Sequence, residues 1–409
     1  MKKKAAIIFT AVFLIVTVIM HDGDLAVITS SFNASSISAK AAVLMCADTG
    51  EVLFSLNKDL RLPMASTTKI MTALIALEDP SPMREIKVTK EMVAVEGTSM
   101  GLLPDDTISL YTLAAGMLLE SGNDAANVTA YAIAGGLNEF AKLMNKKAKE
   151  LGLKNTNFVT PSGLDADKHY STAYDLALLG AAAIKNPLFK EICSQKSMKV
   201  EFGNPPYPRW LYNHNRLLSS YEGTIGIKTG YTKKSGRCLV SAAERNGITL
   251  VAVTLNAPDD WNDHKKMFDY GFSVMKQHDL NDDFSNIYVD VVGGKEKRVA
   301  VTTQSKPQAA AANNLNLSKV KREILIKPFE YAPIKSGEIL GTVRYYLGDR
   351  LLEEQPLCAA ADVEIMEYEI KEKERETLFE KLKNFFSGNN KDNKTEKPTK
   401  QNKEEFKAE

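Results

Sequence analysis

The chain has 409 residues, of which 44% are hydrophobic and 25% charged, and its formal net charge is +1. This composition excludes a largely disordered chain and predicts about one to three globular domains. The balanced charge argues against a nucleic-acid-binding surface over the whole chain. The 4 cysteines have neither C-x-x-C spacing nor a paired histidine cluster, so we expect no metal site and no cofactor. An even number of cysteines permits disulfides in an exported chain, but Cys46 and Cys238 stand in strand-like apolar runs, where buried free thiols are more common.

The first segment has the pattern of a secretory signal, with three lysines at residues 2–4 followed by an apolar run over residues 5–20. The run is short for a transmembrane helix, and an uncleaved anchor is the alternative. Small residues compatible with cleavage occur at residues 28–30 and 37–39. We therefore predict a signal-peptide region over residues 1–39 and a protein that is exported.

Residues 40–280 have strand-like runs at both ends and helix-like runs between them. The strand-like runs are 41–46, 51–55, 239–243 and 250–255, the last two joined by a hairpin turn at 245–247. The helix-like runs, rich in Ala, Leu and Met, are 112–119, 124–134, 137–151 and 173–184. This order predicts an α+β domain in which one sheet, built from both ends of the segment, is covered by helices.

Ser66 and Lys69 form an S-x-x-K motif in this domain, at the start of a predicted helix. Pro63 tends to end an extended approach, and the Ser-Thr-Thr cluster after it suits a helix N-terminus. Residues three apart share one face of a helix, so the Lys69 amine can reach the Ser66 hydroxyl. A serine nucleophile needs a base beside it, and a lysine can be that base when burial or other cations lower its pKa.

Two further motifs follow in the order that catalysis by such a serine would need. Ser121 and Asn123 form S-x-N after a helix-like run, and Lys228, Thr229 and Gly230 form K-T-G before a strand-like run. The order S-x-x-K, S-x-N, K-T-G is the motif set of penicillin-binding proteins and class A β-lactamases. S-x-x-K alone occurs by chance in many chains, whereas the complete triple over this distance is a specific signal.

Short alternating apolar runs broken by Gly and Asp predict a small β-rich domain over residues 281–366. Residues 367–388 are predicted to form an amphipathic helix, and the charged residues 389–409 a disordered tail. The apolar side chains of this helix fall on one face and are Leu378, Phe379, Leu382, Phe385 and Phe386.

Beyond the three motifs, the chain resembles the low-molecular-weight serine-type D-alanyl-D-alanine carboxypeptidases over roughly residues 40–366. The supporting stretches are residues 61–69, 121–126, 152–158, 170–177 and 226–232. The resemblance implies an α+β fold of the penicillin-binding-protein and β-lactamase type, with a sheet covered by helices and a small β-rich domain after it. It also implies removal of the terminal D-alanine from peptidoglycan stem pentapeptides, on the extracytoplasmic face of the membrane or in the cell wall of a bacterium.

The resemblance assigns catalytic roles to four matching positions. Ser66 would attack the carbonyl of the penultimate D-alanine, and Lys69 would accept its proton. Ser121 would relay this proton to the departing D-alanine amine. The backbone N–H groups of Ser66 and Tyr231 would form the oxyanion hole. β-Lactam antibiotics, which mimic the substrate, should be attacked by Ser66 and trap it.

It also assigns substrate-binding roles to four positions. Asn123 would hold the substrate backbone amide, while Lys228 would favour a neutral Lys69 and attract the terminal carboxylate. Thr229 would hydrogen-bond that carboxylate, and Gly230 would let the strand edge approach the substrate backbone. Similar carboxypeptidases often hold the membrane surface through a C-terminal amphipathic helix. A solvated helix is the alternative here, because acidic residues such as Glu372 and Glu380 oppose anionic lipid.

Three other functions stay open. A D,D-endopeptidase would share the site chemistry, and a catalytically silent wall-binding protein would share the fold, although the motif residues are all present. A class A β-lactamase is less compatible, because that chemistry uses a glutamate to activate the deacylating water. Residues 154–175 contain no glutamate, and the second motif reads Ser-Gly-Asn rather than Ser-Asp-Asn.

The sequence departs from the family pattern at two places. His214 is not expected at its position, and a solvent-facing loop histidine is the simplest interpretation. Asp259, Asp260 and Trp261 follow Ala-Pro, where related enzymes often have a basic residue. If that residue helps to hold the substrate carboxylate, Lys228 and Thr229 would carry more of this interaction.

Overall fold

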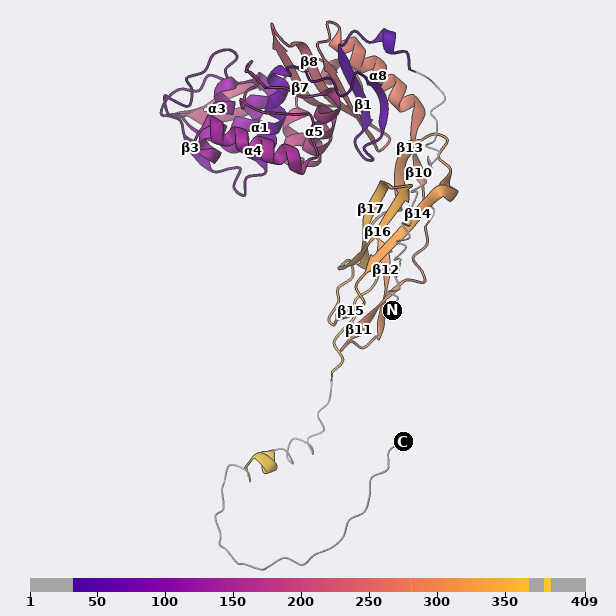
Figure 1. The fold of residues 1–409 in the computed structure, drawn as a ribbon. Helices are drawn as coiled ribbons and strands as arrows, with labels where there is room; N and C mark the ends of the chain where they lie inside the picture. Colours follow the sequence, from indigo (N-terminus) through magenta and orange to yellow (C-terminus); the bar gives the residue numbers. More distant parts are fainter. Residues whose placement is uncertain (1–31, 281, 368–378, 384–409) are drawn as a thin grey trace, which may run out of the picture.

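The structure, a computed structural model, describes residues 32–280, 282–367 and 379–383. A larger body of helices and sheets continues into an elongated β body below it (Figure 1). The predictions for the signal run at residues 5–20, for the tail at 389–409 and for most of the helix at 367–388 lie outside the described residues.

The larger body is organised around a five-stranded sheet of order β2-β1-β9-β8-β7. Its pairings are antiparallel, and β1 pairs with β9, so both ends of the domain meet in one sheet as predicted. Its strands are β1 (Ala41–Cys46), β2 (Val52–Leu56), β7 (Thr224–Thr232), β8 (Gly236–Arg245) and β9 (Ile248–Leu255).

Helices cover both faces of this sheet, and consecutive side chains of a central strand serve two cores. Val43 of β1 belongs to the core on one side, and Leu44 to the core that includes Phe268 of α8 (Asp260–Val274) on the other. Because β1 is buried on both faces, its sequence is apolar without alternation. Figure 1 shows α8 on one side of the sheet and the other labelled helices on the opposite side.

Five helices opposite α8 lie close to their predicted positions. They are α1 (Lys69–Leu77), α2 (Leu110–Ala115), α3 (Asn123–Ala134), α4 (Leu137–Glu150) and α5 (Ala173–Lys185). Two further helices, α6 (Pro187–Cys193) and the short α7 (Leu217–Ser220) before β7, were not predicted. The predicted helix over 112–119 differs in kind, because α2 ends at Ala115 and a π-helical turn at Gly116–Glu120 follows. Ser121, a residue of the site described below, directly follows this turn.

A second, four-stranded sheet of order β3-β4-β5-β6 was missed from the sequence. Its strands are β3 (Glu85–Lys87), β4 (Thr107–Ser109), β5 (Ser197–Gly203) and β6 (Pro206–Tyr212). Two of them have three residues each, too few to show a period. β6 carries prolines that count against a strand, but its side chains are mostly exposed, as at an edge of a sheet.

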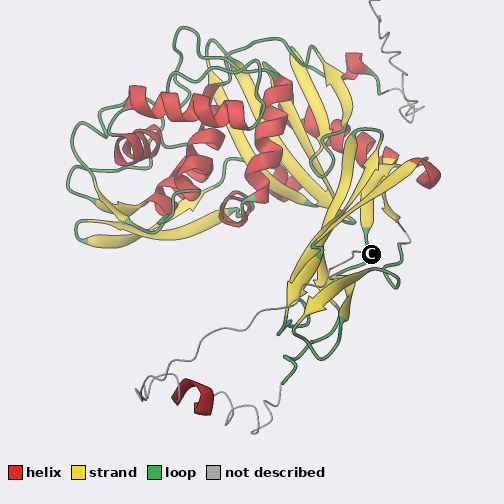
Figure 2. Ribbon diagram, turned by 60° about the horizontal axis from the view of Figure 1, so that its bottom comes forward, coloured by secondary structure: helices red, strands yellow, loops and turns green. Residues whose placement is uncertain are grey.

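The elongated body contains the predicted β-rich domain (Figure 2). Its six-stranded sheet has the order β14-β16-β17-β12-β11-β15, and β10 pairs with β13 beside it. The strands are β10 (Met275–Asp279), β11 (Tyr288–Val292), β12 (Arg298–Thr303), β13 (Gln308–Ala312), β14 (Val320–Ile326), β15 (Phe329–Tyr331), β16 (Ile339–Leu347) and β17 (Arg350–Ala359). Because β10 pairs with β13, this body begins at the end of α8 rather than at residue 281.

Residues 32–39, which the sequence-based boundary placed in the signal region, lie against the catalytic body. Ile37 and Ala39 are buried beside α8, and the ring centroids of Phe32 and Phe54 lie 4.8 Å apart. The Ser38 hydroxyl donates a 2.7 Å hydrogen bond to the buried Asp263 carboxylate. These contacts make residues 32–39 part of the folded domain.

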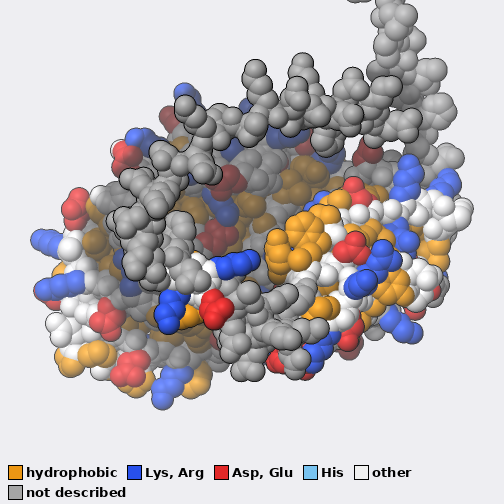
Figure 3. Space-filling view, turned by 90° about the horizontal axis from the view of Figure 1, so that it is seen from below, with side chains coloured by type: hydrophobic (Ala, Val, Ile, Leu, Met, Phe, Trp, Pro, Cys, Tyr) orange, Lys and Arg blue, Asp and Glu red, His pale blue; other side chains and the backbone are white. Residues whose placement is uncertain are grey.

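Acidic and basic side chains are interspersed over the described part of the face in Figure 3, in keeping with the balanced net charge. No helix of the described residues has both the length and the apolar character needed to cross a bilayer. Residues 379–383 are helical, with Phe379 and Leu382 exposed. All 4 cysteines are buried free thiols.

Candidate active site

Ser66 lies in a tight turn that places it directly before a buried helix. Residues Ala65–Thr68 form a 3₁₀ turn and α1 begins at Lys69, so the predicted helix starts in the tighter form. In a 3₁₀ turn, side chains three residues apart eclipse one another. The Lys69 Nζ accordingly lies 3.0 Å from the Ser66 Oγ.

Lys69 is fully buried, and its amine is surrounded by three oxygen atoms. Its Nζ lies 2.7 Å from Oδ1 of Asn123 and 2.6 Å from the carbonyl oxygen of Ser162, in addition to the Ser66 hydroxyl. Burial lowers the pKa of Lys69 well below its ordinary value, the Lys228 charge lowers it further, and Asp124 partly opposes both. The amide oxygen and the carbonyl oxygen can only accept hydrogen bonds. A neutral Lys69 would therefore give its two N–H groups to them and keep its lone pair for the Ser66 O–H.

Asn123, the first residue of α3, has its amide fixed from both sides. Its Nδ2 donates to the Glu96 carbonyl at 2.7 Å, which turns Oδ1 toward Lys69. The sequence analysis assigned Asn123 to the substrate backbone amide. In the structure, its side chain contacts the Lys69 amine.

Ser121 follows the π-helical turn in a left-handed conformation, with φ of 62°. It is 7% exposed and lines the same cleft as Ser66. Among the described residues its hydroxyl makes no hydrogen bond to either lysine, so its proton-relay role stays a prediction. π-helical turns are frequent at functional sites, and this one positions a polar side chain where a continued α-helix would not.

The K-T-G motif lies on β7, whose edge faces the Ser66 turn. Lys228 is buried, donates to the Thr229 carbonyl at 2.8 Å, and has a pKa lowered by burial to about 7. A Cβ built on Gly230 would lie 3.0 Å from the Ser66 backbone nitrogen. A side chain at this position would therefore crowd the nucleophile's own turn, in addition to the approaching substrate as expected. Tyr231, 66% exposed, stands at the rim.

The cleft of about 330 Å³ is also lined by residues that the sequence did not single out as site residues. They are Thr98, Arg216, Arg237, Asp260 and Trp261, with His214 beside them. Of the first five, only Asp260 and Trp261 had been noted in the sequence, as a departure from the family pattern. His214 is exposed as predicted, but it faces the cleft rather than open solvent, 3.8 Å from the Glu120 carboxylate. Burial and Lys228 lower the pKa of His214, and Glu120 opposes them.

The loop before α5 fixes the back of the site through His169. The ring Nδ1 accepts from the Val159 N–H at 2.9 Å, so Nε2 carries the proton and donates to the Thr68 hydroxyl at 2.8 Å. Burial lowers the pKa of His169 to about 4, which keeps it neutral near pH 7. This loop also supplies the Ser162 carbonyl that holds Lys69.

Gly163→Ala is expected to displace this loop and to slow acylation of Ser66. A Cβ at Gly163 would lie 1.9 Å from the Ala65 carbonyl oxygen, directly before the nucleophile. We expect a loss of about 1–3 kcal/mol in stability beyond the backbone cost, measured by thermal unfolding beside β-lactam labelling. Gly152→Ala is the control, because Gly152 also has a positive φ but its Cβ would meet nothing within 4 Å. Equal losses in both variants would contradict the packing argument.

A half-buried serine beside a desolvated lysine, at an open cleft edged by a strand, defines a serine acyl-transfer site. A family model described as D-alanyl-D-alanine carboxypeptidase matches residues 28–259, and one described as penicillin-binding protein 5, C-terminal domain, matches residues 272–365. The chain belongs to the D-alanyl-D-alanine carboxypeptidase family.

Individual relatives agree with this assignment. The chain is 35% identical over 336 residues to D-alanyl-D-alanine carboxypeptidase DacF of Bacillus subtilis, covering 80% of this chain and 86% of the relative. It is 33% identical over 348 residues to DacC of Escherichia coli, covering 81% and 86%. A crystal structure of penicillin-binding protein 5 from Haemophilus influenzae aligns with a TM-score of 0.59 at 28% identity, over 82% of this chain and 100% of that one. The predicted family and fold class are thus confirmed.

Proposed function

We propose that this chain is a serine-type D-Ala-D-Ala carboxypeptidase that removes the terminal D-alanine from peptidoglycan stem pentapeptides and so limits cross-linking. The observation that carries the proposal is the Lys69 amine, buried and 3.0 Å from the Ser66 hydroxyl, with its N–H partners already supplied by Asn123 and Ser162. This arrangement favours a lysine that acts as a base over one that forms an ion pair.

In the acylation step, the Ser66 Oγ attacks the carbonyl carbon of the penultimate D-alanine while Lys69 takes the hydroxyl proton. The negative oxygen that develops is stabilised by the backbone N–H groups of Ser66 and Tyr231. The C–N bond then breaks, the leaving D-alanine amine takes up the proton by way of Ser121, and an ester to Ser66 remains.

In the deacylation step, water attacks this ester while Lys69 again accepts a proton. The C–O bond to Ser66 breaks, its oxygen regains a proton, and the shortened stem peptide leaves as a carboxylic acid. A β-lactam follows the first step but keeps its leaving group tethered, so it holds Ser66 as a long-lived ester.

The residues around the loop before α5 favour this function over a β-lactamase. Where a class A β-lactamase uses a glutamate to activate water, this loop brings the Ser162 carbonyl to Lys69. We therefore expect a stable benzylpenicillin adduct on Ser66, read by intact-protein mass spectrometry, and no rapid release of the opened drug.

The activity is tested by mass spectrometry after incubation with a D-Ala-D-Ala pentapeptide and, separately, with a cross-linked dimer of stem peptides. Release of one D-alanine from the pentapeptide is the expected result. Cleavage of the dimer alone would support the D,D-endopeptidase alternative. Turnover of neither substrate would indicate a catalytically silent wall-binding protein.

For localisation, we propose export and action outside the cytoplasmic membrane, with any signal cleavage falling before Phe32. Cleavage after Ala39 would remove Ser38 from the buried Asp263 carboxylate, leaving that group without its hydroxyl partner. N-terminal sequencing of the exported protein tests this site.

Truncation after Met366 is expected to release the processed enzyme from membranes without changing turnover of a small soluble peptide. The removed segment carries five apolar side chains that the sequence predicts on one face of a helix, each able to contribute roughly 1.5–3 kcal/mol when fully buried. Interfacial burial is partial and nearby acids oppose it, so attachment should be weak and salt-sensitive. The measurement is membrane fractionation with N-terminal sequencing. A truncated chain that stays bound and still begins at Met1 would show that the N-terminal segment is the anchor.

A further inference from the structure

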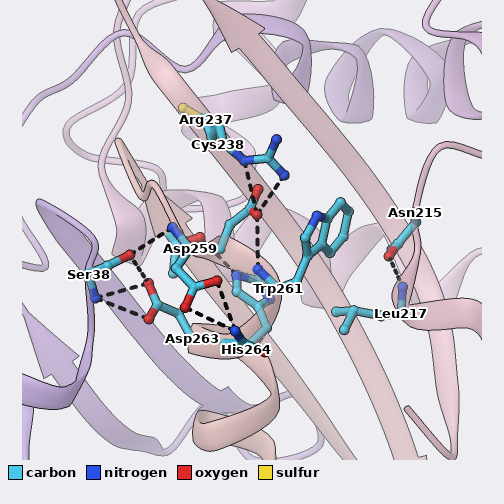
Figure 4. A network of polar contacts seen from close by, with 12 residues as sticks. Ser38, Asn215, Leu217, Arg237, Cys238, Asp259, Trp261, Asp263 and His264 are labelled. Atoms are coloured by element: carbon cyan, nitrogen blue, oxygen red, sulfur yellow. Dashed lines mark hydrogen bonds and ion pairs between the residues drawn. The ribbon is translucent and has the colours of Figure 1, made fainter. Parts of the chain in front are cut away.

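The cleft that Ser66 lines also contains an arginine that two neighbours hold in place. Arg237 of β8 donates from Nε and Nη2 to one oxygen of Asp260, at 3.1 and 2.7 Å. Its guanidinium also lies over the Trp261 ring, 5.6 Å from the centroid. Figure 4 shows the Arg237 guanidinium beside the Trp261 ring. Asp260 and Trp261 are the first two residues of α8.

From this arrangement we propose that Arg237 binds the C-terminal carboxylate of the D-Ala-D-Ala substrate, and that Asp260 and Trp261 position its guanidinium for that contact. The inference rests on the proposed carboxypeptidase function and names the group that recognises the free chain end. It also supplies a cation to a region where the sequence shows acids in place of a basic residue.

The strand register places Arg237 beside the K-T-G motif. Arg237 pairs with Tyr231, and Leu239 pairs with Thr229. Paired residues of antiparallel strands share a face, so Thr229 and Arg237 are diagonal neighbours about 7–8 Å apart, within reach of a long side chain. Both line the cleft that contains Ser66. A carboxylate between them would meet a hydroxyl and a guanidinium at once.

The guanidinium keeps donors free for such a ligand. Arginine has five N–H donors, and the two contacts to Asp260 come from Nε and Nη2. The Arg237 side chain is 42% exposed, whereas that of Asp260 is 3% exposed. The acid is thus shielded from water and its charge is balanced by the guanidinium. Because Arg237 lines the cleft, a carboxylate bound there can accept two of the remaining N–H groups.

Lys228 and Arg216, which also carry basic side chains in this region, are less suited to this role. Lys228 is buried and turned to the carbonyl of its own strand. Arg216 also lines the cleft, but it has no ion-pair partner among the described residues to fix its direction. Arg237 alone combines a fixed orientation with an exposed outer edge.

The test compares kcat/KM for two peptides, one ending in D-Ala-D-Ala with a free carboxylate and one ending in the carboxamide. We expect Arg237→Gln to lower kcat/KM for the free acid about 10- to 100-fold, the range of a charge-assisted contact, and to leave the carboxamide unchanged. Arg237→Lys should restore part of the difference. Arg245→Gln is the matched control, since Arg245 also lies on β8 and stacks over aromatic rings, at the far end of the strand.

Several outcomes would overturn the inference. An equal loss on both peptides would give Arg237 a structural role only, and an unchanged preference would leave it without a role in recognition. If Arg237→Gln unfolds because Asp260 loses its partner, the double variant Arg237→Gln/Asp260→Asn removes both charges and gives the same readout.

The proposed function can fail separately. If the wild type releases nothing from either peptide, the carboxypeptidase function is wrong, and Arg237 is tested by acylation of Ser66 instead. Benzylpenicillin should then react faster than its methyl ester in the wild type but not in Arg237→Gln. Equal rates for acid and ester in the wild type would refute carboxylate recognition itself.

Discussion

Ser66→Ala is expected to abolish covalent labelling by a fluorescent penicillin and release of D-alanine from a pentapeptide. The substitution removes the attacking oxygen, and no acyl-enzyme can form without it. Alanine fits the turn at this position, because Ser66 is only half-buried and its side-chain contact is the 3.0 Å one to Lys69. Gel fluorescence for labelling and thermal unfolding for stability measure the two effects separately.

The control for this prediction is Ser194→Ala. Ser194 follows α6 and donates to the Glu191 carbonyl, away from the cleft. This variant should label like the wild type. Undiminished labelling of Ser66→Ala would assign the nucleophile to another residue, with Ser121 the first to examine because it lines the same cleft.

The candidate site was predictable from sequence where the chemistry depends on side chains at fixed local spacing. Ser66 and Lys69 are one turn apart, and the K-T-G residues lie on one strand, so their relation follows from backbone geometry. The contacts of Lys69 with Asn123 and Ser162 had no such local spacing in the sequence. The Ser162 oxygen belongs to a backbone carbonyl, which any residue can supply, and the Asn123 amide is turned toward Lys69 by the Glu96 carbonyl.

The part of the cleft formed by β8 and α8 was not predictable for a different reason. Arg237 and Trp261 lie on β8 and α8, and only the tertiary packing of α8 on the sheet brings them together. Asp259 and Asp260, which follow Ala-Pro, marked a departure from the family pattern. Arg237, the cation that we propose takes the place of the missing basic residue, lies about twenty residues earlier in the chain, on β8. Its side chain could equally have been a solvated strand residue.

The fold likewise has parts with a local sequence signal, which were predicted, and parts without one, which were missed. The central strands were predicted because burial on both faces leaves continuous apolar runs, and the helices because their segments are rich in Ala, Leu and Met, which favour helices. The second sheet was missed because β3 and β4 are too short to show a period. β13 was missed because it is Ala-rich, and its four alanines form a buried strand through pairing with β10, against the helical preference of alanine.

The two buried lysines form one electrostatic unit. Lys69 and Lys228 are both nearly inaccessible to water, and the charge of Lys228 is the second cause, after burial, that lowers the pKa of Lys69. A positive Lys228 therefore favours the neutral form of Lys69 that catalysis needs. Since burial lowers the pKa of Lys228 itself to about 7, this support weakens as pH rises above neutral.

Lys69→Arg is expected to lower the rate of Ser66 acylation by about 10²–10⁴-fold, the usual contribution of a general base. Arginine keeps the positive charge but stays protonated at every accessible pH, so it has no lone pair for the Ser66 proton. In the wild type, the neutral fraction of Lys69 grows as pH rises through its lowered pKa, and acylation should rise with it, well below the ordinary lysine range. The variant should lose this rise.

Stopped-flow acylation by a chromogenic β-lactam across pH measures both the rate and its pH dependence. Lys147→Arg is the control, because Lys147 of α4 forms a surface ion pair with Glu78 and its replacement should leave the profile unchanged. A near wild-type rate in Lys69→Arg, with the rise preserved, would identify another group as the base. A lower rate with the rise preserved would mean that Lys69 orients Ser66 while a different residue takes the proton.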